Sequence, residues 1–481
     1  IVECTGARAC VDAHGGEAWT CSPDKRCVAV ASEDCKIALD AKERARDDIV
    51  WIGAMFPRKG EHAIAFGDAS GNAVEAARED FARVVGGLPS RVAGRPARPL
   101  GVVSCDDSVA PERVAHHLVN DVGVPAVIGF HLSREVIDLA STIFIPSGTL
   151  AFATLDGGAM VTRVPHPVGS PRLVLRNAVS TTQTTRALAA LIADPRAIDR
   201  GARPDQRPLR VAIVRASDAF GIALADDLSA ALRLDGKPAI EQPERYRDVV
   251  FDPDSARSKN EAARKLVAFS PSVIVFASDE AIVDELLAPT ERDWPRDVAR
   301  PLWLTGNAIE GERFFAFLGR DADRRHRFLG LTTPTSKPAN VRFAARYNQS
   351  FTPEVSAALA PAAPYDAFYA IAYAAYAVGD APLNGVAIAR AMQRIVPPGE
   401  RVEVGPAHIL DALSALHDGR SIDLDGASSG LDFDLATGEA PMTFAVMCVS
   451  VDASGRAIDD VESGLFVDGT RGAVTGSRRC P

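Results

Sequence analysis

VPAVIGFHLSREVIDLASTIFIPSGTLAFAT, residues 124–154, is the stretch of this chain whose pattern decides the fold. An apolar run at 126–128 ends at a glycine, and apolar residues then recur at helical spacing over 136–143. A second apolar run covers 144–152 and is interrupted by a Pro-Ser-Gly turn. This order predicts a strand, a loop, a helix and a second strand.

Two hydroxyl side chains stand at the ends of these elements. Ser133 opens the predicted helix, so we expect it to be the N-cap, where backbone N–H groups and the positive helix end attract anions. Thr154 closes the second predicted strand. We therefore expect the two hydroxyls to face one cleft.

The same alternation of apolar strands and amphipathic helices extends through most of the chain. Its period of about 30 residues predicts a doubly wound parallel sheet, whose ligands lie at the carboxyl ends of the strands. The pattern restarts at residue 209, after the polar, Pro-containing segment 194–208, so we expect two similar α/β lobes. Besides those in the opening stretch, strands are expected at 49–55, 100–103, 209–214, 273–277, 302–305 and 444–449.

Composition excludes two classes of partner. The 481 residues are 47% hydrophobic and 24% charged, as in a folded protein, and no apolar run reaches the ~18 residues that span a bilayer. The 63 acidic and 53 basic residues are scattered and give a net charge of -10. This balance disfavours binding to a phosphate backbone, so we expect no nucleic-acid partner.

Cysteine usage indicates an oxidising compartment. Five of the eight cysteines fall within residues 1–35, and no Cys-x-x-Cys pair of a zinc site occurs. We expect a small disulfide-rich N-terminal segment and a periplasmic or extracellular location, with any signal peptide or lipid anchor outside this chain. We expect Cys4, Cys10, Cys21 and Cys27 to pair among themselves and Cys35 to pair with Cys105. Cys448 and Cys480 should tie down the C-terminal tail.

Other motifs resemble functional sites but lack the structural context that such sites need. The segment 426–430 fits the Gly-x-Ser-x-Gly pattern around Ser428, but a nucleophile elbow needs a strand before it and a helix after it, and we expect a loop followed by a strand. Asp423 and Asp425 lack the third oxygen of a calcium loop. His131 is expected to be an ordinary loop residue. We therefore expect no catalytic residue, no metal and no cofactor.

Seven segments, taken in order, resemble the type I periplasmic solute-binding proteins, the branched-chain amino-acid binding family of ABC transporters. The N-terminal cysteine-rich segment is similar to the leader of some secreted myxobacterial lipoproteins. The seven segments are WIGAMFPRKGEHAIAFGDASGNAVEAA at 51–77, RPLGVVSCDD at 98–107, VPAVIGFHLS at 124–133, IPSGTLAFAT at 145–154, RVAIVRASDAFG at 210–221, PYDAFYAIAYA at 364–374 and SGLDFDLATG at 429–438.

The resemblance implies two Rossmann-like lobes that are joined by three crossings and close on a ligand like a hinged clamp. Residues 1–35 would form the disulfide-rich leader. Lobe one would comprise 36–177 with 335–420, and lobe two 178–334 with 421–481. The chain would capture a small polar solute, an amino acid or a related compound, in the interlobe cleft for an ABC transporter permease. Two alternatives stay open: a ligand-sensing receptor ectodomain and a serine hydrolase that uses Ser428.

The resemblance also implies a set of binding residues. Ser133 and Thr154 match the hydroxyls that hold the ligand's carboxylate, with backbone groups of Leu132, Phe152 and Ala153 beside them. In the second lobe, Phe220 would lie against the ligand, and Asp279 or Glu280 would hold its ammonium group. Tyr365, in the first turn of a predicted helix, is expected to look into the cleft.

Three features depart from the family's pattern. Phe220 stands where a tyrosine is common, Phe130 and His131 occupy the loop before Ser133, and Asp156 would repel a carboxylate. These changes favour a larger or less anionic solute.

Overall fold

The computed structural model describes residues 3–22, 24–60, 62–92, 94–194, 208–278, 280–307, 309 and 311–481, without the side chains of Ala65, Ala219 and Phe220. It divides into two compact units. Unit 1 comprises Ile1–Val179 with Thr335–Pro441, and unit 2 comprises Ser180–Pro334 with Met442–Pro481.

A six-stranded sheet forms the centre of unit 1. Its strand order is β3-β5-β4-β6-β7-β8, with β3 antiparallel to β5 and all other neighbours parallel. The strands are β3 (Cys35–Ala38), β4 (Val50–Phe56), β5 (Leu100–Asp106), β6 (Ala126–Gly129), β7 (Leu150–Ala153) and β8 (Val174–Arg176). Every residue of β4 is buried, as expected for a parallel strand covered on both faces.

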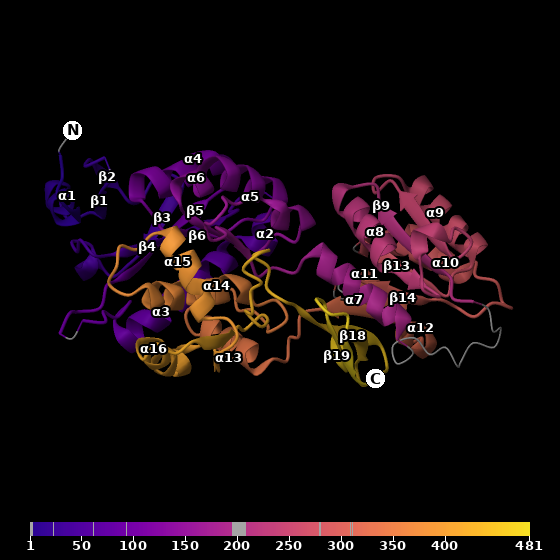
Figure 1. The fold of residues 1–481 in the computed structure, drawn as a ribbon. Coiled ribbons are helices and arrows are strands. Elements are labelled where there is room, and N and C mark those ends of the chain that lie inside the picture. Colours follow the sequence, from indigo (N-terminus) through magenta and orange to yellow (C-terminus); the bar gives the residue numbers. More distant parts are fainter. Residues whose placement is uncertain are drawn as a thin grey trace. The chain divides into compact units, whose positions relative to one another are not determined.

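Helices cover both faces of this sheet, as Figure 1 shows. Alternate residues of β4 enter two cores: Ile52 and Phe56 pack with α3 and α14, whereas Trp51 and Met55 pack with α4 and α5. The unit 1 helices are α2 (His62–Phe66), α3 (Asp68–Val85), α4 (Pro111–His116), α5 (Ser133–Leu139), α6 (Ile145–Ser147), α13 (Pro338–Asn348), α14 (Ala362–Val378), α15 (Gly385–Ala391) and α16 (Ile409–His417). Helix α14 is apolar almost all round and is buried accordingly.

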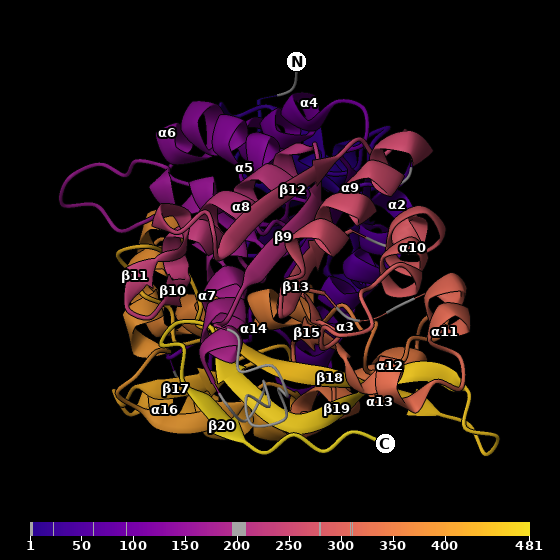
Figure 2. The same cartoon turned by 90° about the vertical axis from the view of Figure 1, so that its right-hand side faces the viewer.

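Unit 2 contains an eight-stranded sheet in the order β12-β9-β13-β14-β15-β18-β19-β20, parallel from β12 to β15 and antiparallel from there on. Figure 2 shows α8 and α9 beside β9 and β12, and the yellow strands β18 and β19. The strands are β9 (Val211–Ala216), β12 (Tyr246–Phe251), β13 (Val273–Ala277), β14 (Leu302–Thr305), β15 (Phe328–Thr332), β18 (Thr443–Val451), β19 (Ala457–Asp468) and β20 (Val474–Gly476). The helices are α7 (Thr181–Ala193), α8 (Ala219–Ala231), α9 (Ala256–Phe269), α10 (Ala288–Arg292), α11 (Glu312–Leu318) and α12 (Ala322–His326).

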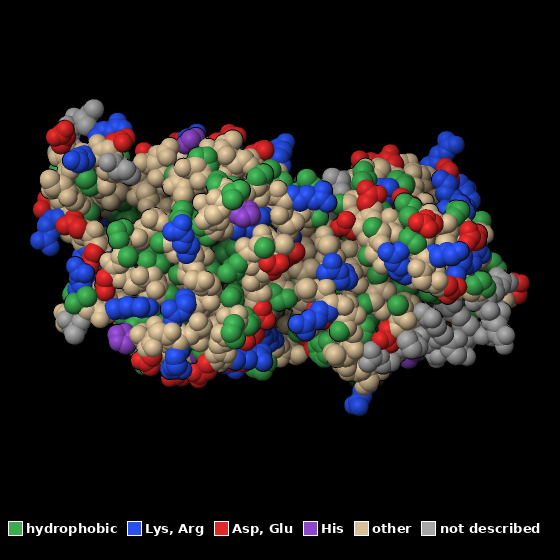
Figure 3. All heavy atoms as spheres, in the orientation of Figure 1, with side chains coloured by type: hydrophobic (Ala, Val, Ile, Leu, Met, Phe, Trp, Pro, Cys, Tyr) green, Lys and Arg blue, Asp and Glu red, His purple; other side chains and the backbone are tan. Residues whose placement is uncertain are grey.

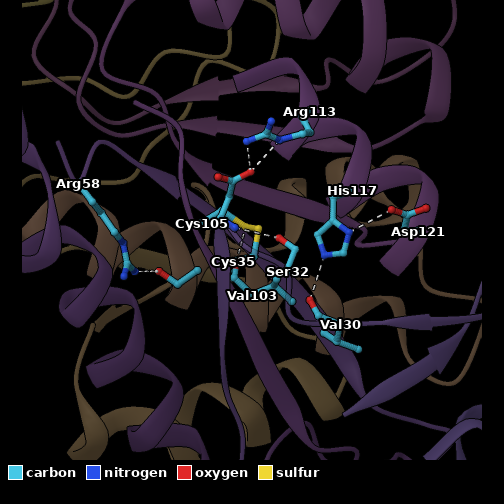
Figure 4. Close-up of a disulfide and its surroundings, with 11 residues drawn as sticks. Val30, Ser32, Cys35, Arg58, Val103, Cys105, Arg113, His117 and Asp121 are labelled. Carbon is cyan, nitrogen blue, oxygen red and sulfur yellow. Dashed lines mark hydrogen bonds and ion pairs between the residues drawn. A yellow bond between two sulfur atoms is a disulfide. The ribbon is translucent and has the colours of Figure 1, made fainter. Parts of the chain in front are cut away.

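Four disulfides use all eight cysteines: Cys4–Cys21, Cys10–Cys27, Cys35–Cys105 and Cys448–Cys480. The pairing predicted for Cys35 is thus confirmed. The first bond joins the residues before α1 (Ala7–Ala13) to β1 (Trp19–Cys21), and the second joins α1 itself to β2 (Cys27–Ala29) of the same hairpin. Figure 4 shows the third, with His117 hydrogen-bonded to the Val30 carbonyl and to Asp121.

Two predictions about element boundaries are wrong. Residues 144 and 145 continue the helical segment instead of starting a strand, and β7 begins only at Leu150. Residues 421–441 belong to unit 1 rather than to lobe two, because β17 (Ile422–Asp425) pairs with β16 (Glu400–Glu403) and Arg176 binds Glu439. Contacts between distant segments, which local patterns do not contain, decide this boundary.

Surface charge is mixed, as the sequence suggests. Acidic and basic side chains are interspersed over the face shown in Figure 3. Among the helices described, none is both long enough and apolar enough to cross a membrane.

Candidate functional site at the carboxyl edge of the unit 1 sheet

The strand order of unit 1 identifies one edge as the place for a site. Strand β4 has β5 on one side and β6 on the other, so the chain reverses its direction of sheet growth at β4. Loops that follow such strands carry the ligand sites of open α/β sheets. Here these loops contribute Asp107 after β5, His131 after β6 and Asp156 after β7.

The end of β6 is shaped by two unusual residues. Gly129 has a φ of 148°, and a Cβ at this position would lie 2.0 Å from the Met55 carbonyl oxygen, so only glycine fits against β4. Phe130 then adopts a φ of 69°, which is rare for a bulky residue, and its ring is fully buried against Phe144. The tight turn directs His131 toward the neighbouring loop after β5.

Ser133 is not the helix N-cap that the sequence predicts. Leu132, with extended backbone, precedes the first helical residue, which is Ser133 itself. The Ser133 hydroxyl instead donates a hydrogen bond of 2.5 Å to Asp156 Oδ1. Burial raises the pKa of Asp156, while the hydrogen bonds from Ser133 and from the Gly158 amide lower it. The Ser133 hydroxyl is thus already engaged by the buried carboxyl group of Asp156.

The other predicted residues of unit 1 are partly occupied by the fold. The Thr154 amide and hydroxyl both donate to the Gly129 carbonyl, at 2.9 and 3.4 Å, and tie the end of β7 to that of β6. The Ala153 carbonyl accepts from the Asn177 amide. The Phe152 side chain is buried in the core, whereas Leu132 is 41% exposed beside the site. Leu132, Ser133 and Thr154 therefore border one edge of the sheet, but Phe152 offers it no side chain.

A buried cluster at this edge was not predicted from the sequence. His131 Nδ1 lies 3.5 Å from Glu135 Oε2 and 4.0 Å from Asp107 Oδ2. Burial raises the pKa of both carboxyl groups, and Asp107 raises the pKa of Glu135 further. Burial and the neighbouring His62 lower the pKa of His131. The spacing of His131 and Glu135, four residues apart at a helix start, was the one local signal available.

The nearby cations are engaged elsewhere. Arg58 contacts Asp68, Lys59 contacts Asp106, and Arg176 binds Glu439 and the Gly158 carbonyl. In the described part of the chain, His131 is the only basic side chain in contact with the carboxyl groups of Asp107 and Glu135. Asp107 and Glu135 therefore have no lysine or arginine beside them within the described residues.

No family model and no curated protein matches the chain. Solved structures do. An ABC transporter substrate-binding protein from Desulfitobacterium hafniense in complex with Leu is 18% identical and matches with a TM-score of 0.53, over 85% of this chain and 99% of that one. A putative branched-chain amino acid ABC transporter from Rhodospirillum rubrum is 16% identical and matches with a TM-score of 0.59, over 85% of this chain and 99% of that one. A solute binding protein from R. palustris in complex with 4-hydroxybenzoate is 12% identical and matches with a TM-score of 0.57, over 90% of this chain and 98% of that one.

The chain has the type I periplasmic-binding-protein fold. The predicted fold class is thereby confirmed. At such low identity the likeness shows the fold alone, and the role of each side chain in this type I fold depends on its own contacts.

The structure corrects the role predicted for Tyr365. Its side chain is only 2% exposed, and its hydroxyl donates to Asp80 Oδ2 at 2.7 Å inside the core of unit 1. Helix α14 is buried on all sides, so its first turn faces the core too. Tyr365 is a packing residue rather than a ligand contact.

The candidates predicted in unit 2 are only partly described. Asp279 lies outside the described residues, and so does the side chain of Phe220, whose backbone belongs to α8. The Glu280 carboxylate accepts a hydrogen bond of 2.9 Å from the Arg313 amide in the first turn of α11. Glu280 therefore already has a structural partner.

Ser428 has a structural partner as well. Its hydroxyl donates to Asp366 Oδ2 at 2.5 Å, and the amides of Ser428 and Ala427 donate to the same carboxylate. Contrary to expectation, strand β17 precedes this segment, but no helix follows it; residues 430–434 form a loop with isolated β-bridges at Gly430 and Asp434. The nucleophile-elbow context is thus incomplete, and Asp366 holds the segment in place.

A separate cavity of about 1050 Å³ lies at the opposite edge of the sheet. It is lined by the disulfide-rich segment, including Trp19 and Arg26, and by residues that precede β6 and β7, such as Pro125 and Thr149. Because it faces the amino ends of parallel strands, it is not where this fold class carries its ligands.

Proposed function

We propose that this chain is an extracytoplasmic solute-binding protein that captures a small carboxylate-bearing solute, an amino acid or a related compound, for an ABC importer. The observation that carries the proposal is the likeness to substrate-binding proteins of ABC transporters, which spans 98–99% of their chains in the three structures described above. Four disulfides support a location in an oxidising compartment.

The ligands of the similar structures narrow the solute class. Those proteins were solved with Leu, with isoleucine, with 4-hydroxybenzoate and with 3,4-dihydroxy benzoic acid. All four ligands carry a carboxyl group, and two have no amino group. We infer that the carboxyl group is the part of the solute that this chain binds. Ser133 and Thr154 are the candidate contacts, and Ser133 can donate to the solute only when its hydroxyl turns away from Asp156.

A thermal-shift screen tests this function. A ligand that binds only the folded state stabilises it by about 2.7 kcal/mol at a concentration one hundred times Kd. We expect at least one proteinogenic amino acid or hydroxybenzoate to raise the melting temperature, and the matching amide or ester to fail. If neither amino acids nor benzoates shift the melting temperature, the proposed solute class is wrong.

Ser133→Ala is expected to weaken the binding of the solute found in that screen about 10- to 100-fold. The reason is that a hydrogen bond to a charged group contributes about 1.5–3 kcal/mol. Calorimetric titration measures the change. Ser141→Ala is the matched control, since Ser141 is an exposed serine on the continuation of the same helix and should bind as the parent does. Equal affinities for the two variants would remove Ser133 from the site.

A further inference from the structure

We propose that Asp107, His131 and Glu135 form a binding site for a divalent first-row transition-metal cation, with Zn²⁺ as the best match. One donor atom from each residue lies within 4.8 Å of the other two, and all three residues belong to unit 1. The site lies at the carboxyl edge of the sheet, between the loops that follow β5 and β6.

The three side chains are buried and lack partners from the rest of the fold. The side chains of Asp107, His131 and Glu135 are 0%, 6% and 6% exposed. Within the described residues, no donor reaches either oxygen of the two carboxyl groups, and His131 Nδ1 has no hydrogen-bond partner; only a proton shared between Asp107 and Glu135 would pair the two acids with each other. Buried polar groups in folded proteins are almost always paired, and an uncompensated pair of buried acids is costly. A bound cation would satisfy all three side chains together.

The donor set has the chemistry of a transition-metal site. One imidazole nitrogen and two carboxylate oxygens suit Zn²⁺, Mn²⁺, Fe²⁺ and Co²⁺, whereas Ca²⁺ and Mg²⁺ prefer oxygen ligands alone. Among these metals, Zn²⁺ is the one that regularly takes four-coordinate tetrahedral sites built from histidine and carboxylate ligands. The other cluster of potential ligands, Cys4, Cys10 and Cys27, is locked in disulfides and offers no thiolate.

The distances between the donor atoms also fit a tetrahedral metal ion. Ligand atoms about 2.0–2.1 Å from a tetrahedral Zn²⁺ lie about 3.3 Å apart. The observed separations of 3.5 and 4.0 Å around His131 Nδ1 require only a small contraction. Three protein ligands leave the fourth position open, which is the arrangement of sites that accept an exchangeable ligand.

The alternative occupant is a single proton shared by Asp107 and Glu135. Such a proton would pair one oxygen of each carboxyl group, and it would leave His131 Nδ1 and the two other oxygens unsatisfied. A cation accounts for the histidine as well, which is why we favour it.

Metal titration of the full-length protein, treated with a chelator and free of solute, tests the proposal. Calorimetry with Zn²⁺ alone should find one site per chain, and Zn²⁺ should raise the melting temperature until the chelator is added back. His131→Gln and Glu135→Gln should each weaken Zn²⁺ binding at least about a hundred-fold, because even groups outside the first shell account for 10- to 100-fold. His166→Gln, an exposed histidine in a loop, should bind as the parent does.

Two results would overturn the site. One is a parent protein that neither binds Zn²⁺ nor gains thermal stability from it. The other is Zn²⁺ binding that survives His131→Gln and Glu135→Gln. Far-UV circular dichroism checks that the variants fold, and if one of them does not, the other decides the question. Because no solute is present, failure here leaves the proposed solute binding untouched.

Discussion

Asp80→Ala is expected to lower the free energy of unfolding by about 3–5 kcal/mol, the range for removing one partner of a buried ion pair. Asp80 is 1% exposed in helix α3 and pairs with the Arg346 guanidinium at 3.0 Å. It also accepts hydrogen bonds from the hydroxyls of Tyr365 and Tyr369, at 2.7 and 3.0 Å. The alanine variant removes the acceptor of two buried hydroxyls and leaves the partly buried Arg346 guanidinium with only Glu79 and Ser350 as partners among the described residues.

Denaturation by guanidinium chloride measures this loss. Glu79→Ala is the control, because Glu79 contacts the same Arg346 at 3.1 Å but is 24% exposed, and it should cost less than about 1 kcal/mol. Tyr365→Phe removes the two hydrogen bonds that this hydroxyl makes with Asp80 and Tyr369 and should cost about 1–3 kcal/mol. A loss in Asp80→Ala no larger than that in Glu79→Ala would show that the buried network contributes little.

Removal of the Cys35–Cys105 disulfide by a double alanine substitution is expected to cost about 4 kcal/mol. The bond closes a segment of 70 residues, and the constraint that it places on the unfolded chain grows with that length. Cys35 faces Cys105 in the register of β3 on β5, so the native state holds both residues in place without the bond.

The comparison variant is the double alanine substitution at Cys448 and Cys480. That disulfide closes 32 residues, so its removal should cost slightly less, by under about 1 kcal/mol. Equilibrium unfolding of both variants, with the remaining disulfides verified by mass spectrometry, gives the comparison. A loss below about 1 kcal/mol for Cys35 and Cys105 would contradict the expectation.

Patterns with a local physical cause could be predicted from the sequence. The apolar run at 49–55 forms β4 because a central parallel strand is buried on both faces. The pairing of Cys35 with Cys105 followed from their positions relative to the leader and the main body. The family resemblance added the fold, which the solved structures confirm.

Features that depend on distant contacts could not be predicted. Ser133 looked like an N-cap because a hydroxyl precedes an apolar helix, but Asp156, 23 residues away, attracts that hydroxyl instead. Tyr365 looked free because it lies in a first turn, but Asp80 binds it across 285 residues. Asp107 meets His131 and Glu135 only when β5 and β6 stand on opposite sides of β4.

The short strand β3 has a consequence for solubility. The parallel edge of β5 would otherwise present unpaired amide and carbonyl groups, which are a template for pairing with another chain. β3 covers that edge with four residues, and its Lys36 is exposed, a combination that discourages further strand addition. Without the disulfide only non-covalent contacts such as its backbone pairing hold β3, so a reduced chain in which β3 frays uncovers an aggregation-prone edge.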